Sequence, residues 1–187
     1  YQVLAQKIAV KYHLDNATPQ AVIAFLKREQ IISPKDVMAL YKKASIEIEG
    51  IINTHHILTL PSEPLNIRLG TLAESKAMPA PHIYMPPRIN NEGMAPEFII
   101  PMKAEGLPYD DFTYLSITIA LMAHEGRPGH DLHLRRVLSP PMSLVRASYA
   151  ENPVNHEGWA LYAEDLIYPY VDIEAQFGIV QMRLLRI

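Results

Sequence analysis

Residues 124–130 read His-Glu-Gly-Arg-Pro-Gly-His, and a second block with acidic side chains, Glu157–Glu164, begins 27 positions after the last of these histidines. Two neutral imidazoles and one carboxylate can hold a zinc ion while its fourth coordination position stays open to water. A neighbouring glutamate can then take a proton from that water. These residue types predict metal-assisted hydrolysis with one zinc ion, although such a ligand set also accepts other divalent ions.

The spacing of the two histidines requires a break in the helix that carries them. Zinc-binding histidines on one straight helix are usually four residues apart. His124 and His130 are six apart, which places them about 240° from each other around a straight helix. Pro128 would interrupt the helix, and Gly129 would permit a positive φ. We expect this turn to reverse the chain and bring the two imidazoles together.

Taken together, the sequences HEGRPGH and EGWALYAE resemble the two motifs of the domain-of-unknown-function 885 family, a bacterial group regarded as zincin-like metallopeptidases. The resemblance covers about residues 60–187 and includes the segment Ala80–Pro87. It implies that Glu125 is the general base and that the metal ligands are His124, His130 and Glu157. Members of that family continue beyond the equivalent of residue 187, so we expect the remainder of a full-length chain to complete the site.

Several neighbouring residues have two interpretations each. Tyr162 either packs in one stripe with Trp159 or donates its hydroxyl to a developing oxyanion, as a catalytic residue. Glu157 could instead be a first-turn acid favoured by the helix dipole. Glu164 lies seven residues after Glu157, on nearly the same helix face, and is expected to hold the distal nitrogen of a ligand histidine. His133 stands where the resembled family usually has glutamine, which makes it a wall of the pocket or an alternative ligand.

Other polar residues near the motif remain open. His156 is expected to cap a helix or to support a ligand, because it cannot easily share a metal with its neighbour Glu157. Three arginines are candidates for binding a substrate carboxylate, and the sequence does not choose among Arg127, Arg135 and Arg146.

Composition excludes several classes of protein. A net charge of −3 argues against a nucleic-acid partner. The absence of cysteine excludes disulfides and thiolate zinc sites, but it identifies no compartment. No apolar run approaches the roughly 20 residues that a membrane span needs. Both ends look cut, so we expect a fragment of a longer protein, truncated at both ends.

Residues 1–60 have helical patterns, with predicted helix starts at Thr18-Pro19 and at Ser33-Pro34, the second helix running to about Ile52. Residues 61–108 contain nine prolines, which interrupt helices and favour a small irregular sheet. Its predicted strands are Asn66–Leu72, His82–Met85 and Glu97–Met102, the last of them an exposed edge strand. The remaining predicted helices are Asp111 to about Glu125, His130–Leu138, His156–Ile167 and Ile173–Ile187.

The predicted fold class is therefore α+β and mainly helical. We expect a helical arm at residues 1–60 and a zincin-like catalytic core with a proline-rich sheet at residues 61–187. The predicted function is zinc-dependent cleavage of a peptide or amide substrate, and an extended peptide would add to the edge strand near Glu97–Met102. The alternatives are a metal-dependent amidase for a small peptide-like metabolite and a non-catalytic, metal-stabilised binding fragment.

Overall fold

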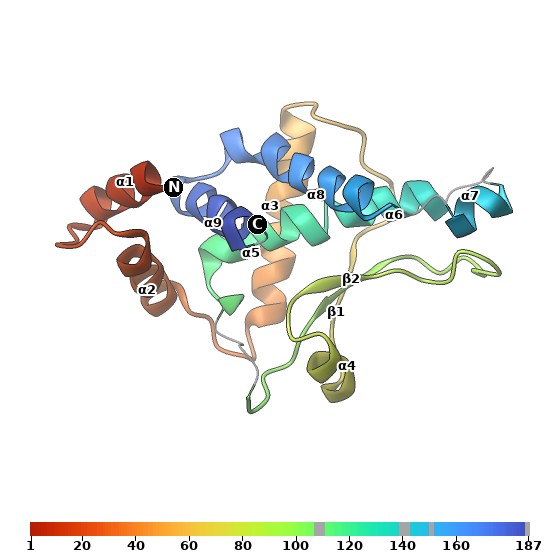
Figure 1. Ribbon diagram of the computed structural model, residues 1–187, viewed down its shortest axis with the longest axis horizontal. Helices are drawn as coiled ribbons and strands as arrows, with labels where there is room; N and C mark the ends of the chain where they lie inside the picture. The colour runs from red at the N-terminus through yellow and green to blue at the C-terminus, as the bar shows by residue number, and fades with distance from the viewer. Residues whose placement is uncertain (107–110, 139–142, 150–151, 186–187) are drawn as a thin grey trace.

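The structure is a computed structural model, and it describes residues 1–106, 111–138, 143–149 and 152–185. It is mainly helical α+β with one three-stranded sheet, as predicted (Figure 1). The elements in chain order are α1 (Gln2–Tyr12), α2 (Pro19–Gln30), α3 (Val37–Thr54), β1 (Asn66–Leu69), α4 (Leu72–Ala77), β2 (His82–Tyr84), β3 (Glu97–Ile100), α5 (Leu115–Glu125), α6 (His130–Leu138), α7 (Leu144–Tyr149), α8 (Pro153–Ile167), the 3-10 turn η2 (Tyr168–Tyr170) and α9 (Ile173–Leu185).

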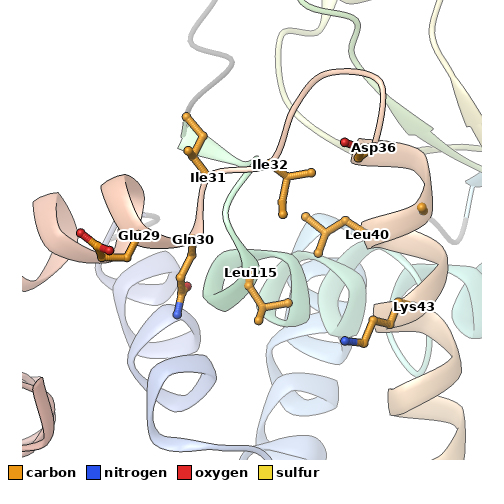
Figure 2. A pocket seen from close by; sticks show the side chains of 9 residues that line it. Glu29, Gln30, Ile31, Ile32, Asp36, Leu40, Lys43 and Leu115 are labelled. Atoms are coloured by element: carbon orange, nitrogen blue, oxygen red, sulfur yellow. The ribbon is translucent and has the colours of Figure 1, made fainter.

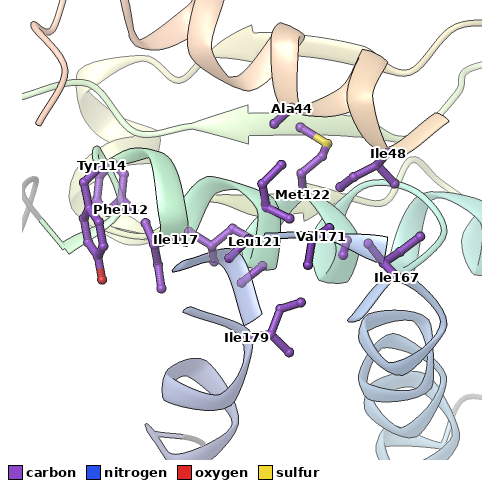
Figure 3. Close-up of a cluster of buried hydrophobic side chains, with 14 of the residues drawn as sticks. Ala44, Ile48, Phe112, Tyr114, Ile117, Leu121, Met122, Ile167, Val171 and Ile179 are labelled. Atoms are coloured by element: carbon purple, nitrogen blue, oxygen red, sulfur yellow. The ribbon is translucent and has the colours of Figure 1, made fainter. Parts of the chain in front are cut away.

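Helix α5 is the central element of the fold. Its side chains are buried from Ser116 to His124, and a helix that is apolar nearly all round has to be covered on every side. It packs against α9, α8 and α3. Figure 3 shows Ile117 and Leu121 of α5 in one cluster with Ile48 of α3 and Ile179 of α9. The C-terminal end of α5 is therefore held in place by the helices packed around it.

Helices α5 and α9 are in close backbone contact at Gly178. A Cβ at that position would lie 2.5 Å from the carbonyl oxygen of Ser116. Such a distance is too short for any side chain, so residue 178 has to be glycine for the two helices to touch.

The sheet has the strand order β1-β3-β2. β1 is parallel to β3, and β2 is antiparallel to it, with His82 opposite Ile99. The prediction that residues 97–102 form an edge strand is wrong, because β3 is the central strand. Phe98, Ile99 and Ile100 are all buried, and the strand ends before Pro101, so no proline interrupts its ladder.

Local capping signals placed some helix boundaries correctly. The Ala21 amide donates to the hydroxyl of Thr18, which caps α2 as predicted. The predicted start at Ser33-Pro34 is wrong, because the Ser33 carbonyl accepts the Asp36 amide in a turn and α3 begins at Val37. The helix expected from Asp111 begins only at Leu115, because Tyr114 pairs with Ile31 in an isolated bridge.

The remaining boundaries follow from local hydrogen bonds. Helix α6 spans the predicted residues, whereas α8 begins at Pro153, earlier than predicted, with Asn152 as its cap. Two short helices, α4 and α7, were not predicted. Thr71 and Glu74 form a capping box at the start of α4, a signal that is present in the sequence.

One continuous cluster of buried apolar residues joins the early helices to the later elements. It contains Ile8, Leu26 and Ile48 together with Phe98 and Ile117. The division into an arm at residues 1–60 and a core at residues 61–187 stays a prediction. Within the described ranges, no helix combines the length and the apolar character needed to cross a membrane.

Gly178→Ala is expected to lower the free energy of unfolding by about 1–3 kcal/mol, because the added methyl group forces α5 and α9 apart. Gly50→Ala is the matched control, since Gly50 is also helical but has no atom within 4 Å of the place that an added methyl group would occupy. There alanine should stabilise the chain by about 0.5–1 kcal/mol through helix propensity. Urea unfolding measures both variants, and equal effects would contradict the tight crossing at Gly178.

Candidate metal centre

His124 lies in the last turn of α5 and is 2% exposed. Its Nδ1 is 2.8 Å from Oε1 of Glu164 on α8. An ionised carboxylate has no proton to give, so Nδ1–H donates; in the neutral imidazole Nε2 then keeps its lone pair. The predicted contact of Glu164 with a ring nitrogen of a motif histidine is confirmed, and the role of His124 as a metal ligand stays a prediction.

Glu164 is itself held by Arg183 of α9, whose Nε donates to Oε2 at 2.8 Å. Arg183 also donates from Nη1 to Asp165 at 2.7 Å. Burial lowers the pKa of the Arg183 guanidinium, but the hydrogen bonds to these two carboxylates outweigh it and raise that pKa above its usual value. The positively charged guanidinium of Arg183 therefore contacts one oxygen of Glu164, while His124 contacts the other.

The turn after α5 is closed by backbone contacts. A Cβ on Gly129 would lie 1.8 Å from the carbonyl oxygen of His124, so only glycine fits. The prediction of a positive φ at Gly129 is wrong, since the described glycines with positive φ are Gly93 and Gly106. The reason for glycine is the close approach of two backbone segments. The Arg127–Pro128 peptide bond is cis.

Arg127 anchors this turn from inside the protein. Its side chain is 2% exposed and donates to Asp131 and Glu49 at 2.9 Å each, and to the Glu63 carbonyl at 2.5 Å. Asp131 is fully buried and also accepts from Arg135 at 2.8 Å. Sequence reasoning missed this network, which ties the turn to α3 and to the loop before β1.

These contacts exclude one of the three arginines that were predicted to bind a substrate carboxylate. Arg127 is buried and bonded within the fold, so that interpretation is wrong for it. Arg135 also binds the Pro64 carbonyl, besides Asp131. Arg146 on α7 is exposed and stays a candidate.

The turn brings His130 back beside His124. Their ring centroids are 4.8 Å apart, and their ring planes are nearly perpendicular. Glu157 of α8 reaches both rings, with Oε2 3.3 Å from Nε2 of His124 and Oε1 3.6 Å from Nε2 of His130. Two ligands of one tetrahedral zinc ion lie about 3.3–3.5 Å apart, given metal–ligand bonds of about 2.0–2.2 Å. The distances from Glu157 to the two histidines are thus close to those between ligands of one zinc ion.

Glu125 lies against the same point and could itself offer a ligand atom there. Its Oε1 is 3.8 Å from Nε2 of His124, and its Oε2 is 4.0 Å from Nε2 of His130. His124, Glu125 and His130 can each offer an atom within 4.8 Å of the others. The side chain of Glu157 is 53% exposed, so the centre opens to solvent on the α8 side.

Trp159 links α8 to the turn. Its indole Nε1–H donates to the carbonyl oxygens of Pro128 at 3.0 Å and Gly129 at 3.1 Å. This bond positions Glu157, two residues earlier on the same helix. Tyr162 is 53% exposed and its ring centroid is 6.0 Å from that of Trp159. It therefore lies on the solvent side of α8, and its catalytic role stays a prediction.

Two further histidines border the centre. Nδ1 of His133 on α6 is 3.0 Å from Nδ1 of His156 on α8. The ring of His156 also stacks on that of His130, with centroids 3.9 Å apart. The expectation that His156 supports a ligand agrees with this stacking.

A separate groove of about 470 Å³ opens where α2, α3 and α5 meet. Figure 2 shows Ile31, Ile32, Leu40 and Leu115 lining it, with charged side chains at its rim. Leu115 is the first residue of α5 and His124 is the last but one, so the groove lining at Leu115 is about 14 Å along the helix from His124 of the metal centre. The groove and the centre are two distinct sites.

The chain belongs to the family described as "Bacterial protein of unknown function (DUF885)", whose model matches residues 1–187. Two solved structures share its fold. One is a "putative lipoprotein of unknown function" from Shewanella oneidensis, with a TM-score of 0.72, 20% identity and coverage of 98% of this chain. The other is a "putative lipoprotein" from Colwellia psychrerythraea, with a TM-score of 0.71, 17% identity and 99% coverage.

This chain covers 35% of the first of those proteins and 32% of the second, about a third of each. At these identities the likeness concerns the fold alone. A comparison with curated proteins found no match.

Glu164→Gln is expected to weaken zinc binding about 10–100-fold. A glutamine has one acceptor oxygen, so it cannot satisfy both the imidazole of His124 and the guanidinium of Arg183. Asp165→Asn is the matched control, because Asp165 also binds Arg183 but does not touch His124. Zinc titration against a competing chelator measures both affinities, and an unchanged affinity in Glu164→Gln would contradict this support.

Proposed function

We propose that this chain is the zincin-like core of a zinc-dependent hydrolase that cleaves peptide or amide bonds. The observation that carries the proposal is the convergence of one carboxylate and two Nε2 atoms, 3.3 and 3.6 Å away, on a point that Glu125 also faces. A second observation supports it: Glu164 directs the Nε2 lone pair of His124 toward that point.

His124, His130 and Glu157 would hold the ion. When bound, zinc supplies a Lewis acid and lowers the pKa of water at its open position to about 7. The three side chains come from α5, α6 and α8, which are packed together. Because the two imidazoles are nearly fully buried, their positions are set by the core rather than by solvent.

Glu125 is the proposed general base. Its oxygens lie 3.8 and 4.0 Å from the nitrogens of the proposed ligands, so the carboxylate is close to any water that binds at the ion's open position. Glu125 would accept a proton as that water attacks the carbonyl carbon. It would then return the proton to the leaving amine, so that the carboxylate is regenerated.

The sheet restricts how a peptide could add itself as a strand. β3 is hydrogen-bonded on both sides, so an added strand has to join β1 or β2. The proposed peptide contact therefore moves from Glu97–Met102 to one of these outer strands. A small amide needs no such contact, so a substrate panel separates a peptidase from an amidase.

One observation favours a second candidate, a metal-stabilised binding fragment without hydrolytic activity. The chain spans only about a third of the two similar solved structures. The remaining part of a full-length protein would then supply a missing substrate or oxyanion contact. Metal binding without hydrolysis in this chain, with hydrolysis in the longer protein, would favour this candidate.

Glu125→Gln is expected to abolish hydrolysis while zinc binding is retained, because the base is lost and the ligands remain. His124→Ala should lose both. Elemental analysis gives the zinc content, and a panel of dipeptides, longer peptides and N-acyl amino acids gives the turnover. Zinc loss in Glu125→Gln, or near-normal turnover, would contradict the assigned roles. No zinc in the unmodified protein after zinc addition would contradict the whole proposal.

Tyr162→Phe tests the proposed hydroxyl donor. If Tyr162 donates to the developing oxyanion, its loss should lower kcat by about 100-fold with little change in KM. Tyr170→Phe is the control, since Tyr170 stacks on His55 beyond the end of α8. Equal kcat values in the two variants would assign Tyr162 to the surface of α8 alone.

A further inference from the structure

A pair of histidines lies next to the proposed zinc centre but outside its ligand set. His133 comes from α6 and His156 from α8, and both are half-buried. Their Nδ1 atoms are 3.0 Å apart, and their ring planes are tilted by 46° with centroids 5.1 Å apart. The proposed ligands His124 and His130 have a similar centroid separation of 4.8 Å.

This geometry is compatible with two ligands on one ion. With metal–nitrogen bonds of about 2.0–2.1 Å, two nitrogens on the same ion are about 2.8–3.4 Å apart for angles between 90° and tetrahedral. The observed separation of 3.0 Å falls in this range. Helices α6 and α8 pack against each other, so the pair is held by the fold rather than formed by chance on a mobile surface.

His130 separates this pair from the zinc centre. Its ring is stacked on that of His156, 3.9 Å away and only 10° from parallel. Ring nitrogens of His130, His133 and His156, one from each, lie within 4.8 Å of one another. Imidazole lone pairs lie in the ring plane, however, so the two stacked rings direct them into parallel planes, which is unfavourable for sharing one ion. The Nε2 of His130 faces Glu157 at 3.6 Å instead. The two candidate positions therefore lie on different sides of one imidazole ring.

We propose that Nδ1 of His133 and Nδ1 of His156 form a second metal site, with water completing the coordination. Two imidazoles select ions such as Zn²⁺, Cu²⁺ or Ni²⁺ over the oxygen-preferring Mg²⁺ and Ca²⁺. The proposed site uses two imidazoles and no carboxylate from the described part of the chain, so we expect it to bind zinc more weakly than the first centre. The proposal does not depend on hydrolytic activity.

The test is a calorimetric titration of the metal-free chain with zinc chloride. The unmodified protein should bind two zinc ions, the second on the order of tenfold or more weakly than the first. His133→Gln should lose only the weaker step, and His124→Ala should lose only the stronger one. His55→Gln is the control for a surface imidazole, because His55 is exposed and stacks on Tyr170. It should keep both steps.

Long-range ¹H–¹⁵N spectra of the histidine rings identify the ligand atoms. The Nδ1 signals of His133 and His156 should shift with the second equivalent of zinc, and magnesium chloride should not shift them. Persistence of the weaker step in His133→Gln would overturn the second site, as would loss of both steps in that variant while its circular dichroism spectrum is unchanged. A shift confined to other histidines would also overturn it, leaving an N–H···N hydrogen bond as the role of the pair.

The titration separates this proposal from the proposed function. A weaker step that is lost in His133→Gln, together with no stronger step lost in His124→Ala, would support the second site and contradict the zinc centre. The reverse pattern would support the zinc centre and contradict the second site.

Discussion

The contact between the backbone of Gly129 and the carbonyl oxygen of His124 constrains the entire candidate centre. A Cβ would lie 1.8 Å from that oxygen, so the turn closes only with glycine. Its closure converts a six-residue spacing, which would separate two side chains on a straight helix, into two imidazoles with centroids 4.8 Å apart. Trp159 then bonds to the same turn, so the position of α8 and its Glu157 also depends on it.

Two ion pairs support this turn from two sides, and three of their four groups, Arg127, Asp131 and Glu164, are buried. Arg127 and Asp131 bind one another beneath the turn, and Glu164 and Arg183 bind behind His124. A buried charge without a partner is costly, and breaking such a pair typically costs about 3–5 kcal/mol. These pairs therefore favour a single arrangement of α5, α6, α8 and α9, which a centre with preorganised ligands requires.

The centre combines rigid and accessible parts. Helix α5 is enclosed by α3, α8 and α9, and it presents His124 and Glu125 from a packed core (Figure 1). Helix α8 contributes Glu157 from a half-exposed position, together with the exposed Tyr162.

Residue types and local spacings predicted the fold class and several helices, because caps, prolines and helical periods act over a few residues. The seven-residue spacing from Glu157 correctly predicted that Glu164 contacts a histidine of the motif. The strand order, the buried Arg127 network and the indole bond of Trp159 could not be predicted in this way. Each of these features joins segments that are far apart in the chain. Strand β3 is central because β1 and β2 pair with its two edges, which local sequence does not specify. The turn at Gly129 was only partly predictable. Pro128 and Gly129 in the sequence indicate that the helix breaks, but the close contact with the His124 carbonyl, which forms only in the folded chain, determines the conformation of the turn.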